Sequence, residues 1–63
     1  MTADQVQRLG RFVAALNDLA EKEGLYVMSR ETVEVHDLRT DAKWTKVSEV
    51  RFDEAGERYE VGY

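Results

Sequence analysis

In this 63-residue chain, one pair of neighbours has side chains of the types used in catalysis and metal binding. The pair is His36 and Asp37. A histidine beside an aspartate can act as a general base with an orienting carboxylate, or both can ligate a metal ion. Neighbouring residues of a strand point to opposite faces, so these two side chains do not converge. The chain has one histidine and no cysteine, whereas a metal site needs three or four ligands. We therefore predict no catalytic residue, no metal and no cofactor, and interpret His36 as exposed at a strand end.

Three glutamates, Glu21, Glu23 and Glu31, are candidates for a carboxylate pair that performs acid–base chemistry. Such a pair needs one carboxyl group whose pKa is raised by an apolar pocket. Two of these residues fall at the end of a predicted helix and one in a predicted strand, without such a pocket. A chain this short also has little volume for a catalytic cleft of roughly 300 Å³ or more. We interpret the glutamates as solubilising and predict that the protein is not an enzyme.

A third group has the chemistry of single-stranded nucleic-acid binding, in which cations hold phosphates and an aromatic ring stacks on a base. It comprises Arg39, Lys43, Trp44 and Lys46. Asp37 and Asp41 dilute this patch, and thirteen acidic against nine basic residues leave a net charge of −4. That charge disfavours a general binder of nucleic acid or of anionic membranes. Nucleic-acid binding is therefore the alternative function, and burial of Trp44 in the core is the competing interpretation of that residue.

The elements that must position these residues begin with an amphipathic helix over 3–23. Its apolar residues recur at spacings of three, four and seven: Val6, Leu9, Phe12, Val13, Leu16, Leu19 and Ala20. Thr2 and Gln5 have the spacing of a capping box, and Gly24 can close the helix in the left-handed conformation. Gly10 lies inside the helix, where it either permits close approach of another element or is simply tolerated.

From residue 25 onward the apolar period changes to two, which predicts three antiparallel strands over 25–36, 44–53 and 58–63. With the tip of the last hairpin at 55–56, one register aligns four side-chain pairs: Phe52 with Tyr59, Val50 with Val61, Asp53 with Arg58, and Arg51 with Glu60. At this tip we expect Gly56 to take a positive φ. For the first hairpin, the simplest pairing sets Val35 against Trp44 and Val27 against Phe52.

The apolar side of the helix must be buried against one face of this sheet. The predicted fold class is therefore α+β: a single domain over 1–63, with one N-terminal helix packed on a three-stranded antiparallel β-meander. The predicted core comprises Leu9, Phe12, Val13, Leu16, Leu19, Val27, Val33, Val35, Trp44, Val50, Phe52, Tyr59 and Val61. Because so short a chain has a thin core, we expect a stability of roughly 3–5 kcal/mol.

On the face of the sheet turned away from the helix, we expect apolar side chains within a charged rim, which is typical of a contact surface. The third strand is an open edge that can accept another strand. The predicted protein-interface residues are Tyr26, Met28, Val47 and Tyr63. We predict a homodimer that acts as a protein-interaction module. Scattered exposed apolar residues, which are common on monomers, are the alternative interpretation.

Two segments, Leu19–Val27 and Glu57–Val61, resemble parts of small accessory proteins of bacteriophages and prophages. The resemblance implies a protein made in the host bacterial cytoplasm that binds a host protein as a modulator or inhibitor, and it implies no catalytic residue. The longest apolar run, Phe12–Leu16, is far shorter than the roughly 20 residues that span a bilayer. The first residues also lack the pattern of a signal peptide. We therefore predict a cytoplasmic protein without a membrane partner.

Overall fold

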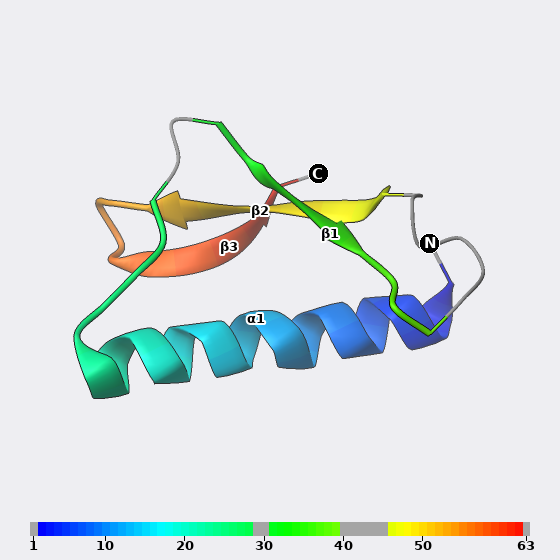
Figure 1. The fold of residues 1–63 in the computed structure, drawn as a ribbon, viewed down its shortest axis with the longest axis horizontal. Helices are drawn as coiled ribbons and strands as arrows, with labels where there is room; N and C mark the ends of the chain where they lie inside the picture. The colour runs from blue at the N-terminus through cyan, green and yellow to red at the C-terminus, as the bar shows by residue number, and fades with distance from the viewer. Residues whose placement is uncertain (1, 29–30, 40–45, 63) are drawn as a thin grey trace.

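The computed structural model describes residues 2–28, 31–39 and 46–62. Its elements are α1 (Ala3–Glu23), β1 (Val33–His36), β2 (Lys46–Asp53) and β3 (Arg58–Gly62). The strands form one antiparallel sheet in the order β1-β2-β3, and α1 runs beneath the sheet (Figure 1). The predicted α+β fold, with one helix on a three-stranded meander, is confirmed.

Both ends of α1 are set by local side-chain and backbone chemistry. The backbone N–H of Gln5 donates to Thr2 Oγ1 at 3.1 Å, and the N–H of Thr2 donates to Gln5 Oε1 at 3.0 Å. At the other end, Gly24 adopts the left-handed conformation with φ 67°, and its N–H donates to the carbonyl of Ala20. The capping box and the closing glycine satisfy backbone groups that a helix end leaves open. The predicted bounds of the helix are confirmed.

The register of the last hairpin is confirmed at all four predicted pairs, including Phe52 with Tyr59 and Val50 with Val61. The turn differs from its prediction, because the positive φ of 53° belongs to Glu57 and not to Gly56. A Cβ at Gly56 would lie 2.9 Å from Asp53 Oδ2. That atom is the flexible end of a side chain, so neither the φ angle nor a rigid contact requires glycine at this position.

The predicted pairing of the first hairpin is wrong. β1 begins at Val33, and the observed partners are Val33 with Val50 and Val35 with Ser48. The register shifts between Val35 and His36, so that His36 pairs with Lys46. β2 has only eight residues and cannot pair along the whole of 25–36. Trp44, the predicted partner of Val35, lies outside the described residues.

The core is smaller than predicted, because α1 packs mainly against β3 and leaves its other flank uncovered. Its buried apolar residues are Leu9, Val13, Val50 and Tyr59, with Leu16, Ala20, Val35, Phe52 and Val61 packed against them. The prediction is wrong for four residues that are about half exposed or more: Phe12, Leu19, Val27 and Val33. The apolar arc of the helix is wider than the part of the sheet that covers it.

Candidate functional site

An open apolar groove lies between α1 and β1, and we call it the β1 groove. It has a volume of about 740 Å³. Its apolar wall comprises Leu9, Phe12 and Leu16 from α1, Val33 and Val35 from β1, Val47, Val50 and Phe52 from β2, and also Val27, Leu38 and Tyr59. The elements that line it, among them α1, β1 and the chain that leaves the helix, can be followed in Figure 1.

Several side chains along the β1 groove are strongly exposed. Phe12 is 51% exposed, Val33 49%, Val27 68% and Leu38 82%. Covering such apolar surface with a partner would stabilise the complex by about 25 cal/mol per Å² removed from water. A contiguous apolar groove of this kind is typical of a surface that binds another protein.

At one end of the groove, Asp37 joins the end of β1 to the first turns of α1. The guanidinium of Arg8 binds both carboxylate oxygens, with Nη1 2.9 Å from Oδ1 and Nη2 2.5 Å from Oδ2. Gln5 Nε2 donates to Oδ2 at 3.2 Å, and the backbone N–H of Arg39 donates to Oδ1 at 2.9 Å. Asp37 is only 5% exposed. Its hydrogen bonds with these three donors make it a structural anchor of the fold.

The same contacts determine the ionisation of the pair. Hydrogen bonds from Arg8, and then from the Arg39 backbone and Gln5, hold the pKa of Asp37 well below its usual range. Asp37 in turn raises the pKa of the Arg8 guanidinium, with a smaller contribution from Asp4. A carboxylate with so low a pKa is a weak base at neutral pH. The pair therefore fits a structural role rather than acid–base catalysis.

Asn17 on α1 occupies the outer edge of β3. Its Nδ2 donates to the carbonyl of Tyr59 at 3.1 Å, and the N–H of Tyr59 donates to its Oδ1 at 2.6 Å. The predicted open edge over 59–63 is therefore wrong at Tyr59. Asn17 was not among the predicted functional residues, although its place one turn after the buried Val13 was a usable signal. A polar residue on the apolar side of a helix commonly has a specific partner.

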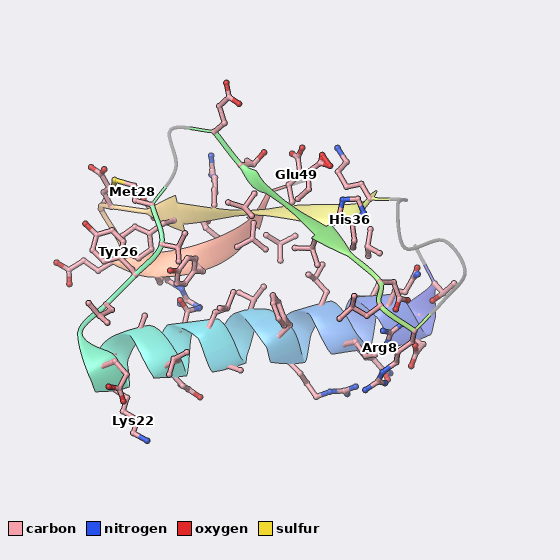
Figure 2. The ribbon with its side chains drawn as sticks, in the orientation of Figure 1. Arg8, Lys22, Tyr26, Met28, His36 and Glu49 are labelled. Atoms are coloured by element: carbon pink, nitrogen blue, oxygen red, sulfur yellow. The ribbon has the colours of Figure 1, made fainter. Side chains whose placement is uncertain are left out.

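The predicted interface residues do not share one face. The ring of Tyr26 stacks on Phe52, with centroids 4.2 Å apart, so Tyr26 lies on the core side of the sheet. Val47 is half-buried and lines the β1 groove. Met28 is exposed near Tyr26 at the end of the sheet where β2 finishes (Figure 2). Tyr63 lies outside the described residues. The predicted grouping on the outer face is wrong, because 25–28 is not a strand and β2 is irregular near Val47.

Of the predicted nucleic-acid patch, the structure describes Arg39 and Lys46, whereas Lys43 and Trp44 lie outside the described residues. Lys46 Nζ lies 3.1 Å from Glu49 Oε1, and this contact lowers the pKa of Glu49. Arg39 is two residues from the buried carboxylate of Asp37. Both described cations therefore have acidic neighbours, which weakens their attraction for phosphate.

His36 ends β1, and its Nε2 lies 3.3 Å from Glu34 Oε1 (Figure 2). Within 2–28, 31–39 and 46–62, no three His, Asp or Glu side chains are grouped to hold a metal ion. In the same part of the chain, no helix combines the length and apolar character that crossing a bilayer requires.

A scan against protein-family models and searches of curated proteins and solved structures each found no match. The site is therefore defined by its own geometry, which is that of an uncovered apolar groove.

Proposed function

We propose that this chain is a non-catalytic protein-interaction module that works as a homodimer, with the β1 groove at its interface. The observation that carries the proposal is the imbalance between buried and exposed apolar residues. Among the described residues, four apolar residues are buried, whereas nine large ones are about half exposed or more. A small domain with so thin a core gains stability when a second subunit covers its exposed apolar surface.

The size of the chain is compatible with such an interface. A stable dimer buries roughly 800 Å² on each partner. This is a modest share of the 5266 Å² of accessible surface on the chain.

The test is the molar mass in solution, measured by light scattering or sedimentation at micromolar concentration. We expect a wild-type mass near twice 7.3 kDa. Phe12→Lys, on the groove, should shift the mass toward one chain, because a charged group would be desolvated at the interface. Met28→Lys is the matched control, since Met28 is also about half exposed but does not line the groove. A monomeric wild type at high concentration would refute the homodimer.

In a phage setting, the dimer would act on a host protein as a modulator or inhibitor in the bacterial cytoplasm. This role is supported by the resemblance of Leu19–Val27 and Glu57–Val61 to parts of small accessory proteins of bacteriophages and prophages. Purified dimer immobilised on a resin should then retain one bacterial protein at constant stoichiometry. Retention that the monomeric Phe12→Lys loses and Met28→Lys preserves would show that the dimer, and not the single chain, binds the partner.

Nucleic-acid binding around Trp44 is the competing function, and it has a direct test. Trp44 is the only tryptophan, so its fluorescence reports on that segment alone. We expect no quenching by single-stranded oligonucleotides at low salt. Quenching that disappears as salt is added would instead favour the nucleic-acid function, because phosphate contacts are salt-dependent.

A further inference from the structure

The segment that follows α1, Leu25–Met28, belongs to neither a helix nor a strand, and we call it the strap. Figure 1 shows it running from the end of α1 toward the sheet. All four of its side chains are large and hydrophobic, and they are between 47% and 73% exposed. Because side chains this exposed gain little from burial, other contacts must hold the strap in place.

In the described part of the chain, two directional contacts hold the strap, and both lead to the core. The ring of Tyr26 stacks on Phe52, with centroids 4.2 Å apart. The backbone N–H of Val27 donates to the hydroxyl of Tyr59. Among the described residues, the strap takes part in no backbone–backbone hydrogen bond. The hydroxyl of Tyr59 is therefore the acceptor that fixes the backbone of the strap.

Tyr59 is suited to this task because its own position is fixed on several sides. It is 6% exposed, and its backbone N–H and carbonyl are both bound by Asn17 of α1. Its ring lies edge-to-face with Phe52, and the same two residues are partners in the sheet. The hydroxyl therefore extends a fixed connection from α1 and β3 to the strap.

Val27 carries the placement of the strap into the β1 groove. Of the four strap residues, Val27 alone lines the groove, together with Phe12 and Leu16 of α1 and Val33 of β1. A strap released from Tyr59 would remove this wall. The groove would then offer a smaller apolar surface to the second copy.

The total exposed surface agrees with a second copy that covers this region. A folded monomer of 7.3 kDa exposes about 4,200 Å² according to the usual scaling of surface with mass. This chain exposes 5266 Å², which is about 1,100 Å² more than that scaling gives. A stable dimer buries roughly 800 Å² on each copy. The excess is therefore large enough to form one side of a dimer interface.

We infer that Tyr59 is a positioning residue for the dimer interface: its hydroxyl holds the strap so that Val27 forms a wall of the β1 groove before the second copy binds. This inference rests on the proposed homodimer and adds the residue that prepares its surface. Ordering a segment beforehand removes that cost from association. The buried hydroxyl should therefore strengthen the dimer without contacting the second copy.

Two matched variants each remove one hydroxyl from the same aromatic cluster and keep its ring. Tyr59→Phe deletes the acceptor of the Val27 N–H, whereas Tyr26→Phe deletes a hydroxyl that has no hydrogen-bond partner among the described residues. Amide hydrogen exchange, measured in the Phe12→Lys background to exclude the second copy, reports on the strap. Exchange at Val27 should be about fivefold faster in Tyr59→Phe and unchanged in Tyr26→Phe. Unchanged exchange in Tyr59→Phe would overturn the inference.

The dissociation constant of the dimer, measured by sedimentation over a concentration series, is the second readout. Tyr59→Phe should raise it by about fivefold to 25-fold, because each of the two copies must then order its own strap. Tyr26→Phe should leave it unchanged. A hydroxyl with a merely structural role would lower the urea midpoint of Tyr59→Phe and leave the dissociation constant unchanged, which would overturn the inference.

Val27→Ala tests the groove wall even if Tyr59→Phe does not fold, because it keeps the backbone N–H and removes only methyl groups. It should raise the dissociation constant without changing exchange at residue 27. Because the hydroxyl acts through Val27, Tyr59→Phe should weaken the dimer less in the Val27→Ala background than in the wild type. Unchanged affinity in Val27→Ala, or strictly additive effects, would overturn the inference.

The outcomes separate this inference from the proposed function. A dimeric wild type whose dissociation constant is the same in folded Tyr59→Phe overturns the positioning role but leaves the homodimer in place. A wild type that stays monomeric at high concentration overturns both.

Discussion

The carboxamide of Asn17 binds the backbone of Tyr59 in both directions, accepting from its N–H at 2.6 Å and donating to its carbonyl at 3.1 Å. One side chain of α1 thus takes the place that a fourth strand would occupy beside β3. The hydroxyl of the same tyrosine accepts a hydrogen bond from the N–H of Val27. Tyr59 therefore joins the helix, the sheet and the segment that follows the helix.

Asn17→Ala should destabilise the protein by about 1–3 kcal/mol, because a partly buried backbone N–H loses its acceptor. The neighbouring Asp18→Ala, at an exposed position, should change stability by less than about 0.5 kcal/mol. Urea denaturation of the two variants measures the difference. Equal midpoints would show that the contact between Asn17 and Tyr59 does not stabilise the edge.

Asp37 and Asp4 both bind Arg8, but only Asp37 is buried, so the two make a matched pair of variants. Asp37→Asn should lower the melting temperature more than Asp4→Asn does, because it leaves the Arg8 guanidinium without its more buried partner. Thermal melts followed by circular dichroism at neutral pH would show this order. The reverse order would contradict the anchoring role of Asp37.

The pH dependence of stability should follow from the lowered pKa of Asp37. The carboxyl group of an unfolded aspartate has a pKa of about 3.9, and folding lowers the pKa of Asp37 below that value. The ionised carboxylate therefore contributes its full stabilisation of the folded state at pH values above about 3.9. The contribution is lost as the pH falls through the lower, folded value. Urea midpoints of the wild type should therefore decrease from about pH 5 toward about pH 2, and Asp37→Asn should decrease less steeply over the same range. Parallel curves would contradict this prediction.

Two glycines of the helix region should respond to alanine in opposite directions. A Cβ at Gly10 would meet no other atom within 4 Å, so Gly10→Ala should stabilise the protein by about 1 kcal/mol through helix propensity. Gly24 has φ 67°, so Gly24→Ala should destabilise it by about 1 kcal/mol. Thermal melts of the two variants should move to opposite sides of the wild type. A loss of stability in Gly10→Ala would reveal a close contact at this position.

Phe52 lies between two aromatic rings, stacked on Tyr26 and edge-to-face with Tyr59 at 5.2 Å. Phe52→Ala should cost about 3 kcal/mol, which is comparable to the whole expected stability. Arg51→Ala should cost less than about 1 kcal/mol, because its ion pair with Glu60 is exposed. Denaturant midpoints that coincide for these neighbours would contradict the assignment of their two faces.

Features that depend on residues close together in the chain were predictable from sequence. The capping box joins Thr2 to Gln5, Gly24 directly follows the helix, and four complementary pairs define the hairpin between β2 and β3. In each case, the favourable contacts are made by side chains close together in the sequence. A different helix end or hairpin register would lose several of these contacts at once. The β1 pairing was not predictable in this way, because a long polar segment precedes β2 and the register shifts at its start.

Only the tertiary structure decided which strand lies closest to the helix. Because α1 packs toward β3, Phe12 is left exposed beside β1 and a groove remains where a continuous core was expected. The contacts that hold this placement join residues 29 positions apart, Arg8 with Asp37, and 42 positions apart, Asn17 with Tyr59. Hydropathy periodicity carries no information about such polar pairs. They form only when packing of the apolar residues brings the two segments together, and they then hold α1 against the end of β1 and against β3.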